Sequence, residues 1–184
     1  MNCGDSIRVV HPLFQEEDDG SIPVSPLQFN FGRIDYKTAA NLCDLWHSSM
    51  PYIGSASVCS PCYGAEYKNT FYAIAMWSLP IAANRIVDGN KLLELRRMAI
   101  SDDAPRNTAS KMLSWMRKDI KKIRPDIIRL ISYQDTGAHH GTIYKASNWV
   151  IERESEYISW DKHRTRPGQL EQSTANKIRW GITT

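Results

Sequence analysis

Apolar side chains recur every three or four positions in two stretches of the chain, which predicts two amphipathic helices. The first covers residues 36–47, follows Asp35 as a candidate N-cap, and carries the stripe Ala39, Leu42, Cys43 and Trp46. The second covers residues 108–123 and carries the stripe Met112, Leu113, Met116 and Ile120. Cations crowd its other side and its last turn, where they stabilise the helix dipole: Arg117, Lys118, Lys121 and Lys122.

Shorter apolar stretches predict strands at residues 28–34, 71–79, 92–100, 127–133 and 149–151, with a short helix at 142–147 before the last one. Residues 71–79 and 92–100 are expected to pair antiparallel, because the connection through the turn at 88–90 is short. This order of elements predicts an α+β domain with one mixed, largely antiparallel sheet flanked by helices.

The composition fits one globular domain. The chain has 184 residues, of which 42% are apolar and 23% charged. We expect an extended N-terminal arm over residues 1–27 with acidic residues at 16–19, a core domain over 28–160, and a basic segment over 161–184. No run is apolar and long enough to span a bilayer, and the first residues lack a signal pattern, so we expect a cytoplasmic protein.

Charge is distributed unevenly along the chain. Residues 1–90 contain five Lys/Arg and nine Asp/Glu, whereas residues 91–184 contain eighteen and eleven. A basic half can hold the phosphates of a cofactor or of nucleic acid, and it can equally be a solvated helix face. The C-terminal segment mixes cations with Trp180, which is compatible with gripping DNA and also with a solvated tail.

The order of these elements resembles the GNAT acyltransferase superfamily. Residues 93–100, the polar loop after them and the following helix resemble its acyl-CoA-binding strand, loop and helix. Residues 129–135 resemble the next strand, and residues 141–149 resemble a short helix that carries a tyrosine. The resemblance implies acyl-CoA, such as acetyl-CoA, as the donor, and these donor-binding residues: Arg97, Met98, Ile100, Asn107, Ser110 and Lys111.

One part of that motif differs from the superfamily pattern. Residues 106–111 contain no glycine, where ordinary members have a glycine-rich loop that lets backbone amides approach the pyrophosphate. The helix start still offers N–H donors, and Thr108 or Ser110 can add a hydroxyl. Phosphate binding at this loop therefore remains an expectation.

Within the superfamily, the chain resembles the Mom-like DNA-modification branch over about residues 28–150. The matching segments are residues 45–51, Arg96 with Arg97, residues 107–110, and residues 132–135 with Tyr144. This resemblance implies a phage anti-restriction enzyme that transfers an acyl-derived, carbamoylmethyl-type group to the N6 amine of adenine. Its partners would be double-stranded or locally unpaired DNA and acyl-CoA, and a homodimer stays open. Two alternatives are an ordinary N-acetyltransferase acting on a small amine, protein or tRNA, and a non-catalytic nucleic-acid-binding protein.

Candidate catalytic residues are Tyr144, His47 and Asp135. The resemblance places Tyr144 where GNAT enzymes have the acid that protonates the departing thiolate, although a helical tyrosine is more often a packing residue. Taken alone, His47 is a helix-end residue and Asp135 a turn former. With His139 or His140 they would supply the two imidazoles and one carboxylate of a non-haem iron site, and the resemblance implies iron at His47 and Asp135.

Two further pairs of residues stand out. Cys59 and Cys62 form a single CxxC, which lacks the further ligands of a zinc site and is interpreted as a coincidence in a surface loop. Arg96 and Arg97 are expected to point to opposite faces of a strand, so that one of them meets a carboxylate or a ligand phosphate.

Overall fold

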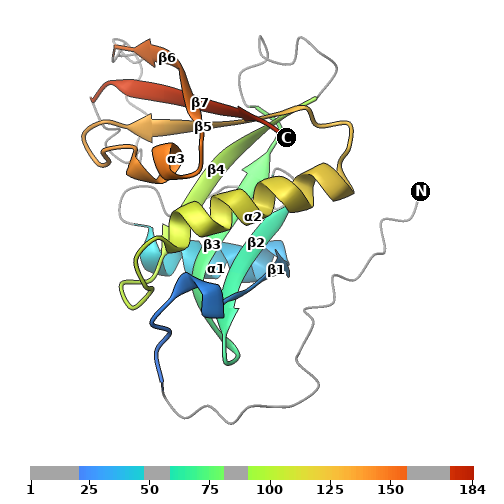
Figure 1. Ribbon diagram of the computed structural model, residues 1–184, viewed down its shortest axis with the longest axis vertical. Helices are drawn as coiled ribbons and strands as arrows, with labels where there is room; N and C mark the ends of the chain where they lie inside the picture. The colour runs from blue at the N-terminus through green and yellow to red at the C-terminus, as the bar shows by residue number, and fades with distance from the viewer. Residues whose placement is uncertain (1–20, 48–58, 81–90, 157–174) are drawn as a thin grey trace, which may run out of the picture.

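Figure 1 shows one sheet with helices on both faces in the computed structural model, which describes residues 21–47, 59–80, 91–156 and 175–184. The strand order is β1-β2-β3-β4-β5-β7-β6. The strands are β1 (Asn30–Ile34), β2 (Cys62–Tyr67), β3 (Thr70–Ser78), β4 (Leu92–Ile100), β5 (Arg129–Asp135), β6 (Val150–Ser155) and β7 (Lys177–Thr183). The helices are α1 (Tyr36–Trp46), α2 (Thr108–Ile123) and α3 (Thr142–Ala146), after a 3-10 turn at Pro26–Gln28.

The predicted fold class is confirmed. β4 and β5 pair parallel, whereas every other neighbouring pair of strands is antiparallel, including β3 with β4 as expected. Helix α2 has the predicted bounds, and α1 ends one residue earlier than predicted. Asp35 is the N-cap of α1, where its carboxylate accepts a hydrogen bond from the Thr38 backbone amide at 2.9 Å.

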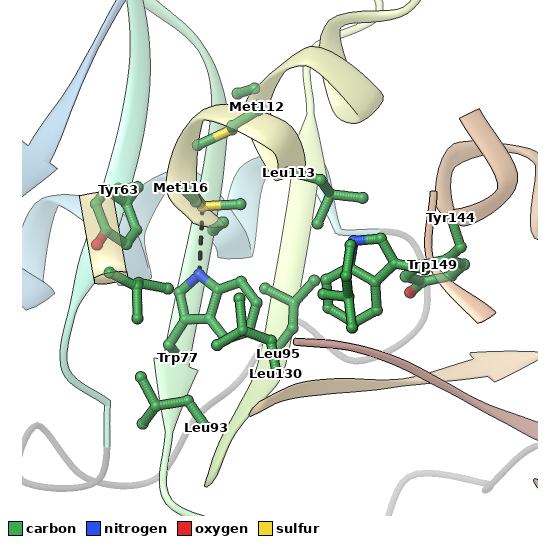
Figure 2. Close-up of a cluster of buried hydrophobic side chains, with 14 of the residues drawn as sticks. Tyr63, Trp77, Leu93, Leu95, Met112, Leu113, Met116, Leu130, Tyr144 and Trp149 are labelled. Carbon is green, nitrogen blue, oxygen red and sulfur yellow. Dashed lines mark hydrogen bonds between the residues drawn. The ribbon is translucent and has the colours of Figure 1, made fainter. Parts of the chain in front are cut away.

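Each face of the sheet has its own hydrophobic cluster. The predicted stripe of α2 is fully buried, with Met116 accepting a hydrogen bond from the Trp77 indole N–H at 3.2 Å (Figure 2). Tyr144 and Trp149 belong to the same cluster. On the opposite face, Ala39 and Cys43 of α1 pack on β2, β3 and β4. Full burial of one large apolar side chain, such as a leucine or methionine of α2, contributes about 1.5–3 kcal/mol to the stability of the fold.

The pattern of apolar residues did not predict two of the strands, β2 and β7. β2 is buried along nearly its whole length between β1 and β3, so its sequence lacks the alternation of a half-exposed strand. The prediction that residues 149–151 form the last strand is wrong, because β7 follows and pairs with both β5 and β6. Its residues had been assigned to the basic C-terminal segment. The acidic cluster at 16–19, the turn at 88–90 and residues 157–174 lie outside the described residues.

The parallel strands β4 and β5 pair over only part of their length. Leu92–Leu95 of β4 is in register with Arg129–Ser132 of β5, and the pairing ends there. The two strands then run apart toward their C-terminal ends (Figure 1). We call this divergence the fork. Because the strands are parallel, α2 begins at the same end of the sheet, after the loop that follows β4.

Candidate functional site

Tyr144 lies at the base of the fork. Its hydroxyl is 2.9 Å from the Ser132 Oγ, and Ser132 is the last β5 residue in register with β4. Both residues are buried, so the Tyr144 hydroxyl is shielded from bulk solvent. Burial raises the pKa of Tyr144, and the hydrogen bond with Ser132 offsets part of this rise. The phenol is therefore protonated at neutral pH.

Aromatic packing holds the Tyr144 ring in place. The ring stacks on Trp180 of β7 with centroids 5.3 Å apart, and Trp149 lies on another side at 5.7 Å, as Figure 2 shows for Trp149. The Trp180 indole donates to the Gln134 Oε1 at 2.7 Å, and the Gln134 amide donates to the His139 carbonyl at 2.6 Å. Trp180 is thus a core residue, which removes it as a stacking platform for DNA.

The residue before the first turn of α2 has a left-handed backbone conformation. Asn107 is the N-cap of α2 with a φ of 69°, and its side chain makes no capping hydrogen bond. Asparagine adopts this conformation more readily than other residues with a Cβ. The glycine-free loop therefore makes a left-handed turn at the helix start, and the Asn107 side chain does not cap the amides of the first turn.

Both arginines of β4 lie on the α1 face of the sheet, so the prediction of opposite faces is wrong. Met76 and Trp77 of β3 pair with Arg97 and Leu95, which leaves Arg96 as the extra residue of a β-bulge. The bulge shifts the alternation by one position. Accordingly, Met98 and Ile100 pack on the α2 face. The Arg97 guanidinium instead interacts electrostatically with Cys43 and Cys59, which lie on the α1 face.

His47 is the C-cap residue of α1, and its imidazole lies within reach of the charge of Arg97 beside the bulge. Burial lowers the pKa of His47, and the charges of Arg97 and His139 lower it further. Its imidazole is therefore neutral at pH 7 and able to accept a proton. The His47 imidazole therefore lies within reach of charges from both sides of the fork. Arg97 belongs to β4, and His139 follows β5.

The Asp135 carboxylate interacts with groups that hold the local structure. Its carboxylate forms an ion pair with the Lys177 ammonium and accepts a hydrogen bond from the Gly137 backbone amide at 2.9 Å. Among the described residues, no group of three or more His, Cys, Asp or Glu side chains is arranged to hold a metal ion. Within the described ranges, the residues around His47 and Asp135 therefore do not supply the ligand set of the iron site that the resemblance implied.

Cys59 and Cys62 are buried rather than part of a surface loop, and Cys62 begins β2. They share the α1-face cluster with Cys43, and all three thiols are free. Burial raises the pKa of Cys43 to about 11 and that of Cys62 to about 12. These thiols are protonated packing residues at neutral pH.

Comparisons with known proteins decide the family. The model of the Mom protein family matches residues 28–180. The chain belongs to the Mom protein family. The methylcarbamoylase Mom of Escherichia phage Mu is 34% identical over 88 residues, which is 45% of this chain and 36% of that protein. The match thus spans little more than a third of the phage Mu protein's length.

The fold of this Mom-family chain is that of the GNAT acetyltransferases. A probable acetyltransferase from Staphylococcus epidermidis superposes with a TM-score of 0.60 at 8% identity, over 85% of this chain and 99% of the other. A GNAT family acetyltransferase from Elizabethkingia anophelis, solved with acetyl-CoA bound, gives 0.57 at 12% identity over the same shares. No helix within the described ranges is long and apolar enough to cross a membrane.

Sequence reasoning missed two supports of the site, Ser132 and Gln134. Ser132 is buried at the base of the fork, and Gln134 links Trp180 to the His139 loop. Polar residues inside an otherwise apolar strand were the available signal, because a buried polar group needs a partner. The strand predicted from the apolar pattern ends at residue 133, but β5 continues through Asp135 and includes Gln134.

Proposed function

We propose that this Mom-family protein is a DNA-modifying transferase that moves an acyl-CoA-derived, carbamoylmethyl-type group to the N6 amine of adenine. The observation that carries the proposal is the fork, with the protonated Tyr144 at its base and the start of α2 at the same end of the sheet. Family membership and the phage Mu methylcarbamoylase favour DNA as the acceptor.

The donor would bind along the open side of β4. Beyond Leu95, β4 is no longer paired with β5. Arg97, Met98 and Ile100 would therefore offer backbone N–H and C=O groups to an extended ligand such as the pantetheine arm. The pyrophosphate would meet the first turn of α2, with the Ser110 amide and hydroxyl and the Lys111 ammonium nearby in sequence. In this arrangement Arg97 serves the donor through its backbone only.

Tyr144 and His47 can account for the protons of the transfer. A carbamoylmethyl group is bonded through its CH2 carbon, so its formation from an acyl-CoA also needs a nitrogen donor and a two-electron oxidant. The step assigned here is the attack of the adenine amine on the thioester carbonyl, in which an N–C bond forms and the C–S bond to CoA breaks. The amine loses one proton in this step, and the departing CoA thiolate gains one. We assign the first proton to the neutral His47 imidazole and the second to the Tyr144 phenol. Asp135 would act as a positioning residue, since it holds the turn that leads to His139.

The acceptor has to leave the base stack to reach this site. The N6 amine is paired and stacked inside duplex DNA, so the enzyme acts on a flipped or unpaired adenine. DNA as the substrate would place the protein in the cytoplasm of its host.

Co-expression with a plasmid tests the proposal. Plasmid DNA from cells that make the wild-type protein is digested to nucleosides and analysed by mass spectrometry. We expect a modified deoxyadenosine whose mass matches a carbamoylmethyl group, a much smaller amount with Tyr144→Phe, and an unchanged amount with Lys118→Gln, which alters an exposed cation on α2. Unmodified DNA together with acetylation of a small amine or a protein would instead identify an ordinary N-acetyltransferase.

A further inference from the structure

The β-bulge brings two positive charges together on the α1 face. Arg96 and Arg97 are consecutive, and without the bulge their side chains would lie on opposite faces of β4. The Arg97 guanidinium donates to the Arg96 carbonyl at 2.7 Å, and burial together with the charge of Arg96 lowers the pKa of Arg97. The bulge thus keeps two mutually repelling guanidinium groups side by side.

The charge of Arg96 is only partly balanced in the described part of the chain. Arg96 is 3.8 Å from the Glu94 carboxylate, and its side chain is only 14% exposed. One of its terminal nitrogens, Nη1, is completely buried and has no hydrogen-bond partner among the described residues. A buried guanidinium nitrogen without an acceptor costs free energy, so an anionic ligand at this position would supply the missing acceptor.

We infer that Arg96 and Arg97 form a phosphate-binding subsite on the α1 face of the fork, which takes a backbone phosphodiester of the DNA strand that carries the target base. The inference rests on the proposed function for the identity of the acceptor. Guanidinium groups suit this ligand because their planar N–H donors match the oxygens of a phosphate. His47 lies near Arg97 on this face, so a strand held here would enter the fork next to His47.

The face of the sheet on which Arg96 and Arg97 lie favours a DNA phosphate over a CoA phosphate as their ligand. The proposed pyrophosphate site is the start of α2, and α2 packs on the face that carries Met98 and Ile100. The guanidinium groups lie on the other face, with Cys43 and Cys59. A donor that extends along the edge of β4 toward α2 would leave this second face to the acceptor strand.

Binding of a short single-stranded oligonucleotide with one central adenine tests the subsite. Fluorescence anisotropy measures its affinity over a range of salt concentrations, and calorimetry measures the affinity for CoA. For Arg97→Gln and Arg96→Gln, we expect about tenfold weaker oligonucleotide binding and a salt slope shallower by about 0.7. Arg96→Gln, which changes no donor-binding residue, should leave the CoA affinity unchanged. Arg96→Lys should restore part of the affinity, and Lys118→Gln, which removes one exposed cation on α2, should keep it.

A neutral linkage locates the phosphate. One methylphosphonate is placed at each position around the adenine in turn. At one position it should weaken binding by the wild type and have no further effect in Arg97→Gln. Equal losses in both proteins at every position, unchanged affinity in the arginine variants, or loss of CoA binding instead would overturn the subsite while wild-type DNA binding and modification stand. A wild-type protein that binds no DNA would overturn the proposed function as well. Melting temperatures close to that of the wild type confirm that the variants are folded.

Discussion

The Tyr144 hydroxyl is hydrogen-bonded to Ser132, the β5 residue that faces Leu95 where the pairing of β4 and β5 ends. The protonated phenol therefore lies at the base of the fork, where the proposed thioester would be. Tyr144→Phe keeps the ring and its stacking on Trp180 but leaves the buried Ser132 hydroxyl without this partner. We expect a loss of about 1–3 kcal/mol in stability and about a hundredfold loss in DNA modification.

Ser132→Ala is the matched control. It removes the same hydrogen bond but retains the phenol, so its stability should fall by a similar amount while modification stays within a few-fold of wild type. Urea denaturation and nucleoside mass spectrometry measure the two effects. Equal modification rates for Tyr144→Phe and wild type would show that the tyrosine only packs.

The left-handed conformation of Asn107 leads to a second prediction. Asn107→Gly satisfies the φ of 69° without strain and should bind CoA as tightly as wild type. Asn107→Val introduces a β-branched side chain that strongly disfavours this region, so stability should fall by about 1–2 kcal/mol or more and CoA binding should weaken as the start of α2 shifts. Calorimetry with CoA checks both variants. Wild-type affinity in the valine variant would separate the loop from donor binding.

Gly181 of β7 leaves room for a buried carboxylate. A Cβ at this position would lie 1.5 Å from the Glu152 Oε1, and Glu152 is paired with Arg129 and Arg179. Gly181→Ala should therefore displace Glu152 and lower stability by about 1–3 kcal/mol. Gly32→Ala on β1 is the control, because a Cβ there has no atom within 4 Å and should leave stability nearly unchanged. Thermal unfolding compares the two, and equal melting temperatures would contradict the argument.

The depressed pKa of His47 predicts a dependence of stability on pH. Burial lowers the pKa in the folded state below the value of 6.5 that applies in the unfolded chain. The unfolded state therefore binds a proton first, so the contribution of His47 to stability is present above pH 6.5 and is lost as the pH falls toward the folded pKa. His47→Gln should flatten this part of the curve. Urea titrations between pH 5 and pH 8, about the range in which histidine titrates, measure the difference.

Local patterns predicted the elements that bury one face. The stripes of α1 and α2, the Asp35 cap and the strand β4 were all predicted from spacing alone, because each has its apolar side chains on one side and recognisable ends. β2 was missed because it is buried on nearly all sides. β7 was missed because its cations suggested solvent, whereas Lys177 and Arg179 lie against Asp135 and Glu152, which are distant in sequence.

For the site, the sequence by itself determined which residue types are present. Through the resemblance, it also indicated which of them are candidates for function: Tyr144, His47 and the pair Arg96 and Arg97. Only the tertiary structure decided what each one meets. The partner of Tyr144 on β5, the bulge that turns Arg96 and Arg97 to one face, and the Lys177 that occupies Asp135 all depend on which strands pair and in which register. Register is set by packing of the whole sheet, and one added residue reverses every side chain after it, so no local pattern could contain these contacts.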